Sequence, residues 1–207
     1  RGRGAEGGAA ATLHELGVVH VRRAEWESAT ALLKQSLAMK RERRPCGTTN
    51  RTGNCIGKAA ASSGGGGVGT ARHHSRFREE AATLHQLAVA AMSSKPPRLA
   101  EADALLREAL ALEDQGPVAL GARAATLQQL ARVAERCGDA HAARAHLEEA
   151  LAMQTRAYGE GVAHVNKAAT LSQLASLALQ SGDTEHASQV LGEALEMRRQ
   201  IYGHGGG

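Results

Sequence analysis

Four copies of a six-residue pattern, Ala-Thr-Leu-x-x-Leu, divide this chain into repeated units. Their threonines are Thr12, Thr83, Thr126 and Thr170. The last three lie roughly 43 residues apart, whereas the first two are farther apart. Regular copies of one motif indicate units that stack on their neighbours. The longer first interval therefore predicts an insertion between the first unit and the second.

A second pattern follows each copy of this six-residue motif, which we call the hexamer, and has the spacing of a helix. It starts at Ala29, Ala102, Ala143 and Ala187, with leucines four and eight positions later in every copy. This spacing places one apolar stripe on a helix. Gly138-Asp139 and Gly182-Asp183 separate the two patterns in the last two units, where the glycine can end one helix and the aspartate can cap the next. Each unit is thus predicted to be a helix, a turn and a second, antiparallel helix.

The fold predicted from these repeats is an all-α solenoid of four antiparallel helical hairpins, with one disordered insertion. Helices are expected at 9–23 and 25–42, 78–92 and 98–114, 121–137 and 139–157, and 165–181 and 183–201. The first hairpin is assigned to 1–43, a flexible basic insertion to 44–75, three further hairpins to 76–203 and a glycine-rich tail to 204–207. Aromatic residues make up only 2% of the chain, which argues against a sandwich or barrel.

Charge and cysteine content narrow the classes of function. The formal net charge of +4 comes from a basic excess in residues 41–80, so a basic body that could wrap a nucleic acid is not expected. Three cysteines without framework spacing fit a reducing compartment, and no apolar run is long enough to span a membrane. We expect a cytoplasmic protein without a membrane contact.

The insertion contains several motifs that match binding sites only by letter. Gly64-x-Gly66-x-x-Gly69 lacks the preceding strand of a dinucleotide site. The spacing between Cys46 and Cys55 is not that of a zinc finger, although His73 and His74 could complete four ligands. We therefore expect no metal and no cofactor. Glycine, serine and arginine dominate this segment, and a retained intron in the gene sequence would have the same composition.

The order of the repeated residues resembles the tetratricopeptide repeat. The resemblance rests on Leu-x-x-Leu-Ala in the first helix, glycine at the turn and Ala-Leu in the second helix. The long period, together with the unit endings Tyr158-Gly159 and Tyr202-Gly203, resembles the long repeats of the kinesin light chain. This resemblance implies a protein-interaction scaffold without catalytic activity, and, if it extends to role, a cargo adaptor. It also implies that the first helix of each unit lines a concave groove where ligands bind.

The candidate groove residues then occupy two adjacent positions of the hexamer, together with positions one and two helical turns farther along the same helix. They are His14, Glu15, His85, Gln86, Gln128, Gln129, Arg132, Arg136, Ser172, Gln173, Ser176 and Gln180. A glutamine amide can pair with both the N–H and the C=O of an extended peptide. Arg132 and Arg136 lie one turn apart and suit an acidic residue in an internal segment of a partner protein. The alternative interpretation is that these polar residues only form a solvent-exposed helix face and bind no ligand.

Two further hypotheses concern the ends of the array and the basic segment. The last helix is expected to expose its apolar stripe, which predicts either a longer array or self-association through uncapped ends. The alternative function is association with nucleic acid through the insertion and Arg1-Gly2-Arg3-Gly4. That alternative predicts steeply salt-dependent binding.

Overall fold

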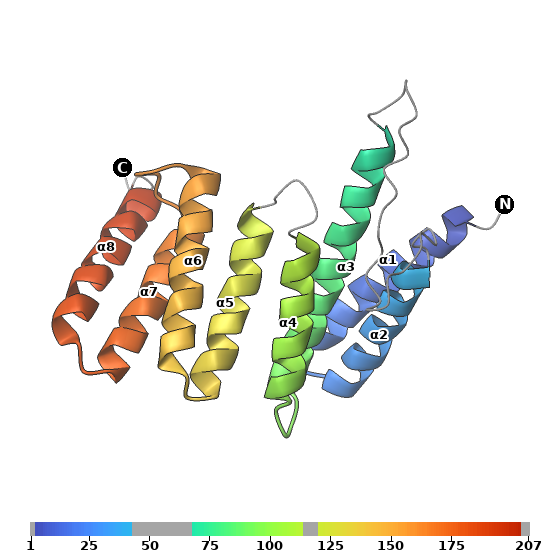
Figure 1. The fold of residues 1–207 in the computed structure, drawn as a ribbon, viewed down its shortest axis with the longest axis horizontal. Helices are drawn as coiled ribbons and strands as arrows, with labels where there is room; N and C mark the ends of the chain where they lie inside the picture. Colours follow the sequence, from blue (N-terminus) through green and yellow to red (C-terminus); the bar gives the residue numbers. More distant parts are fainter. Residues whose placement is uncertain (1–2, 43–67, 114–119, 204–207) are drawn as a thin grey trace, which may run out of the picture.

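The structure, a computed structural model, describes residues 3–42, 68–113 and 120–203, with side chains from residue 8 in the first range and from residue 75 in the second. Within these ranges the chain forms eight helices in four antiparallel pairs. The pairs are α1 (Arg3–Arg22) with α2 (Trp26–Glu42), α3 (Val68–Ser93) with α4 (Leu99–Glu113), α5 (Leu120–Arg136) with α6 (Ala140–Tyr158), and α7 (Val165–Gln180) with α8 (Thr184–Tyr202). They stand side by side in chain order (Figure 1), which confirms the predicted all-α solenoid of four hairpins.

Two helices begin earlier than the sequence predicts. α1 begins at Arg3 rather than at residue 9, and α3 begins at Val68 rather than at residue 78. Residues 68–75, expected to belong to the insertion, therefore extend a helix. Once a helix is nucleated, each added residue gains one backbone hydrogen bond, and no glycine or proline follows Gly69 in this segment to stop it. The rest of the expected insertion and the tail 204–207 lie outside the described residues.

The turns within the last two units follow the predicted chemistry. Gly138 and Gly182 both have a φ of 81°, the left-handed conformation that glycine adopts without a Cβ clash. Asp139 and Asp183 then each accept a hydrogen bond from the backbone amide three residues later, at 2.9 and 3.1 Å. In the first unit Ala24 takes the same conformation, with a φ of 59°. The first unit therefore keeps the conformation of this turn, although alanine stands in place of glycine.

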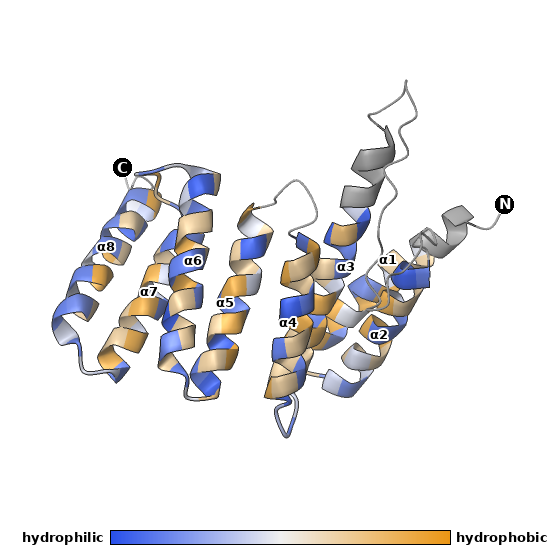
Figure 2. Ribbon diagram, in the orientation of Figure 1, coloured by the Kyte–Doolittle hydropathy of each residue, from blue (hydrophilic) through white to orange (hydrophobic). Residues whose placement is uncertain are grey.

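The repeated leucines form the core by packing from one unit onto the next. Each cluster combines a leucine of a second helix with two leucines of the following hexamer. The combinations are Leu33 with Leu84 and Leu87, Leu106 with Leu127 and Leu130, and Leu147 with Leu171 and Leu174. Apolar and hydrophilic residues alternate along each helix (Figure 2), as expected for helices with one buried stripe. Stability thus comes from contacts between nearest neighbours.

The two helices of a unit occupy different sides of the array. α1 contacts α3, and α3 contacts α5, so the first helices of neighbouring units meet directly. The second helices make no comparable contacts with each other within the described ranges. The first helices therefore form an inner face, which is the side on which the candidate residues were predicted.

Candidate functional site

Side chains of neighbouring first helices reach one another across the inner face. The His14 ring nitrogen Nδ1 on α1 lies 3.1 Å from the Thr83 hydroxyl on α3. Between α5 and α7, the Gln128 amide donates to the Thr170 hydroxyl at 2.7 Å, and the Gln180 amide donates to Glu135 at 3.0 Å. These contacts place three of the predicted residues where successive units meet.

The threonine of the repeated hexamer is the centre of each internal junction. It is buried in the second, third and fourth units. A side chain near the end of the preceding second helix contacts it each time, and this side chain is always the eleventh residue after the alanine that opens the second pattern. The pairs are Lys40 Nζ with Thr83 at 2.7 Å, Glu113 with Thr126 at 3.1 Å, and Gln154 with Thr170 at 3.0 Å. The same contact to the threonine hydroxyl therefore recurs at each junction, although the group that makes it is an ammonium, a carboxyl group or an amide.

The first of the two adjacent hexamer positions is therefore largely engaged within the protein. His14 and Gln128 contact the threonine of the next unit, and Ser172 accepts a hydrogen bond from Arg198 at 3.1 Å. Gln128 uses one amide N–H in this junction, so its side chain is held in place by the next unit. His85 is half-buried beside the third unit.

One residue at the second hexamer position and two residues one helical turn farther along are accessible. Glu15, Arg132 and Ser176 are exposed. The Arg132 guanidinium donates to Gln129 at 3.1 Å, so these two groups form one polar patch. Gln173 is half-buried, and its carbonyl oxygen is buried without a partner among the described residues.

Arg136 is exposed but does not act as a free charge. Its guanidinium donates to the Met92 carbonyl at 2.6 Å, near the C-terminal end of α3. A cation at this end of a helix interacts favourably with the helix dipole. Arg136 therefore joins two first helices, whereas Arg132 presents the basic group one turn earlier.

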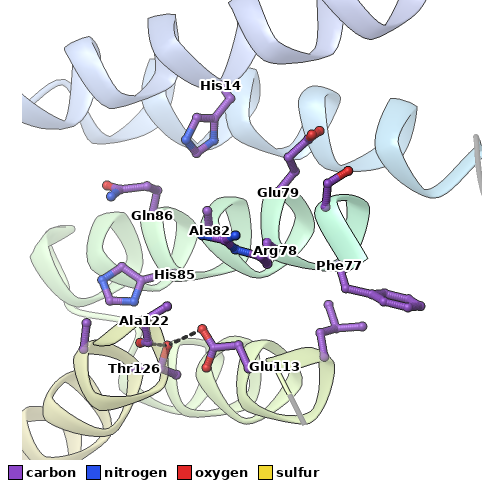
Figure 3. Close-up of a pocket in the computed structure, with 13 residues that line it drawn as sticks. His14, Phe77, Arg78, Glu79, Ala82, His85, Gln86, Glu113, Ala122 and Thr126 are labelled. Atoms are coloured by element: carbon purple, nitrogen blue, oxygen red, sulfur yellow. Dashed lines mark hydrogen bonds between the residues drawn. The ribbon is translucent and has the colours of Figure 1, made fainter. Parts of the chain in front are cut away.

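A pocket of about 530 Å³ opens on the inner face where the first three units meet. Figure 3 shows His14 on one side, the α3 residues Ala82, Arg78 and Gln86 in the middle, and the hydrogen-bonded Glu113 and Thr126 on the other side. The full lining is His14, Ser75, Phe77, Arg78, Glu79, Ala82, His85, Gln86, Leu112, Glu113, Ala122, Ala125 and Thr126. This volume is in the range of ligand pockets. Three predicted groove residues are thus brought together in one cavity.

Burial controls the charge of the ionisable groups in this pocket. Burial lowers the pKa of His85, and burial together with the charge of Lys40 lowers the pKa of His14. Both rings therefore favour the neutral form, which carries one donor and one acceptor. Burial raises the pKa of Glu113, although the Thr126 hydrogen bond and Arg123 oppose this shift. The pKa shifts of His14, His85 and Glu113 therefore all favour the neutral form of the group.

The pKa of His85 predicts a stability that falls on acidification. Its pKa is lower in the folded chain, so the unfolded chain binds the proton first as the pH drops from about 7 to about 5.5, and the free energy of unfolding decreases. Glutamine occupies the equivalent position in the third unit, as Gln128. In a His85→Gln variant, the free energy of unfolding should therefore fall less on acidification than in the wild type. Denaturant unfolding of both proteins at the two pH values measures it. Identical pH dependence would show that His85 is not the group responsible.

Some sequence hypotheses fall outside the described residues. These are the cysteines of the supposed zinc quartet, the glycine motif that ends at Gly69, most of the basic insertion and Arg1-Gly2. Among residues with described side chains, no group of three or more histidine, cysteine, aspartate or glutamate residues could hold a metal ion. No helix in the described ranges is long and apolar enough to cross a membrane.

Stacked helical hairpins whose first helices share an inner face define an α-solenoid repeat protein. Two family models, both for the tetratricopeptide repeat, match residues 9–43 and 122–200, together more than half of the chain. The chain therefore belongs to the tetratricopeptide repeat family, as the sequence resemblance predicted. No curated protein sequence matches it.

Solved structures confirm the likeness to kinesin light chain repeats at the level of the fold. One holds the nearly identical TPR-like repeats of a Podosopora anserina protein assigned as a kinesin light chain. It is 19% identical with a TM-score of 0.65, over 92% of this chain and 75% of that one. Another is BtubC (BKLC) from P. vanneervenii, which is 15% identical with a TM-score of 0.70, over 96% of this chain and 66% of that one.

The sequence did not reveal the junction residues, or ten of the thirteen residues that line the pocket. Lys40, Glu113 and Gln154 share a position but not a chemistry, so comparison of the repeats does not reveal them. The recurring threonine was a usable signal, because a polar residue within an apolar pattern needs a hydrogen-bond partner when it is buried. Ser75 and Phe77 line the pocket because α3 begins before its predicted start at residue 78.

Proposed function

We propose that this protein is a non-catalytic interaction scaffold that binds an extended segment of a partner protein along its inner face. Tetratricopeptide repeats generally mediate binding of proteins or peptides, which supports the scaffold role. The observation that carries the choice of face is the pocket on this side of the array, which three of the predicted groove residues, His14, His85 and Gln86, help to line.

Two parts of the inner face have different roles in this proposal. The pocket between the first three units receives a side chain of the bound segment, because its lining is mainly apolar with a few polar groups. The patch formed by the exposed Arg132 and the half-buried Gln129 contacts the segment farther along, where the guanidinium favours an acidic residue. The bound segment is internal to the partner and carries at least one carboxylate.

The fold likeness to kinesin light chain repeats extends the proposal to a cargo adaptor. In that role, the inner face would hold a segment of a cargo or adaptor protein. The nucleic-acid alternative gains no support from the described residues, because most of the basic insertion, and Arg1-Gly2 of the N-terminal Arg1-Gly2-Arg3-Gly4, lie outside them.

Arg132→Glu is the substitution that tests this proposal. Arg132 contacts only a neighbouring side chain of its own helix among the described residues, so its reversal should leave the array intact. Arg136 is unsuitable, because it links α5 to α3. Proteins captured from cytosolic extract by the wild-type chain should be captured about tenfold less by the variant, since loss of one ion pair corresponds to about 1.4 kcal/mol.

The matched control is Arg156→Glu, which reverses an exposed arginine on the second helix α6. Circular dichroism must first show equal helicity for the three proteins. The control should retain every partner. If Arg132→Glu also retains them, or if both variants lose them equally, the inner face is not the binding surface.

A further inference from the structure

The last second helix exposes two leucines whose equivalents in the earlier units are buried or half-buried. Leu191 on α8 is 42% exposed, whereas the equivalent Leu33, Leu106 and Leu147 are 0%, 0% and 2% exposed. Leu195 is 50% exposed, whereas the equivalent Leu37 is 6% exposed. In the internal units this face packs against the first helix of the following unit. No described element covers it on α8.

The first helix of the array exposes the complementary side of the same junction. Leu16 on α1 is 45% exposed, whereas the equivalent Leu87, Leu130 and Leu174 are 2%, 1% and 9% exposed. Thr12 is also exposed, although the other three hexamer threonines are buried. Its hydroxyl bonds only to the Gly8 carbonyl of its own helix, at 2.9 Å, among the described residues.

The two faces therefore carry the two halves of one interface that the chain already forms three times. α1 and α8 lie at opposite ends of the array (Figure 1). We propose that copies of this chain associate head to tail, with the α8 face of one copy packed against the α1 face of the next. Leu191 and Leu195 would cover Leu16 of the next copy, as Leu106 covers Leu130 inside the chain.

The polar part of the junction is also present in both halves. Arg198 on α8 occupies the position of Lys40, whose ammonium group donates to Thr83 in the first internal junction. In the head-to-tail contact Arg198 would face Thr12 of the next copy and could donate to its hydroxyl. The α8 face and the α1 face thus carry both the apolar and the polar groups that form an internal junction. A second copy would bring them together in the same register.

This contact is heterologous, since each copy uses a different face toward each neighbour. Such contacts produce rings or open chains of copies and not a symmetric pair. Analytical ultracentrifugation of the full chain should therefore show a mass that rises with protein concentration from the 21.6 kDa of one copy. Association through the inner face is not required, so this inference is independent of the proposed function.

Two variants, each changed at one end, make the test specific. Leu16→Glu should disable the α1 face, and Leu191→Glu/Leu195→Glu should disable the α8 face. Each side chain is exposed in the single copy, so folding should be kept, which circular dichroism checks. Either variant alone should associate at least about tenfold more weakly than the wild type.

A mixture of the two variants gives the decisive result. Each retains one intact face, so the mixture should form a dimer of one copy of each and nothing larger. The control is Val162→Glu, which makes the same change at a similarly exposed valine between α6 and α7 and should associate like the wild type. A wild-type chain that stays at the mass of one copy, end variants that match the control, or a mixture that forms no dimer would each overturn the proposal.

Discussion

Leu106→Ala is expected to lower the free energy of unfolding by about 2–5 kcal/mol, because it leaves a cavity in the junction between the second and third units. Leu106 is fully buried and packs with Leu127 and Leu130. Alanines already fill many core positions, so few large neighbours can collapse into the space. Denaturant unfolding at low protein concentration, followed by circular dichroism, measures the change.

Leu191→Ala is the matched control, because the repeat places Leu191 at the same position in the last unit. Its side chain is 42% exposed, so the same truncation should cost less than about 1 kcal/mol in the single copy. Both variants replace leucine by alanine in a helix, so the change in helix propensity is the same. The difference between their free energies of unfolding therefore reports the effect of burial. Equal losses would contradict the stacking of units as the source of stability.

Thr170→Val is expected to destabilise the chain by about 2–3 kcal/mol through loss of the junction hydrogen bonds. The Thr170 hydroxyl lies 3.0 Å from the buried Gln154 carbonyl oxygen and accepts the Gln128 amide at 2.7 Å. Valine keeps the shape but leaves a buried acceptor without its donor and an amide without its acceptor. Thermal and denaturant unfolding should both report the loss.

Thr12→Val provides the internal comparison for this hydroxyl. Thr12 is exposed and bonds only to a carbonyl of its own helix among the described residues. The change in its unfolding free energy should therefore lie within about 0.5 kcal/mol. A loss as large as that of Thr170→Val would mean that the hydroxyl acts within its own helix and not across the junction.

The helical hairpins were predictable because two independent patterns define each unit. The leucines four and eight positions after Ala143 fix one helix, and the hexamer at Thr126 fixes the other, so the turn at Gly138 has little freedom. The start of α3 was not predictable, because no apolar stripe precedes Phe77 and helix propagation alone decides how far it extends. Helix ends depend on such local competition more than on the buried face.

The candidate site was predictable as a face but not as a set of free side chains. Helical spacing predicts His14, Gln128 and Arg132 on one side of the first helices, and the structure places His14 and Gln128 in contact with the next first helix. Which of these groups remains available depends on the distance to the next unit, and a single unit contains no information on that distance. His14 and Gln128 reach the next threonine, whereas the hydrogen bond of Arg132 among the described residues is to Gln129 of its own helix.

Site-specific photo-crosslinking tests the proposed binding face most directly. A photoreactive amino acid would replace Ser176, an exposed residue on the inner side of α7, and separately Glu148, an exposed residue on the second helix α6. Partner proteins should crosslink at position 176 and not at position 148, with the attached peptide containing an acidic residue. Crosslinks that form equally at both positions, or only at position 148, would contradict binding along the inner face.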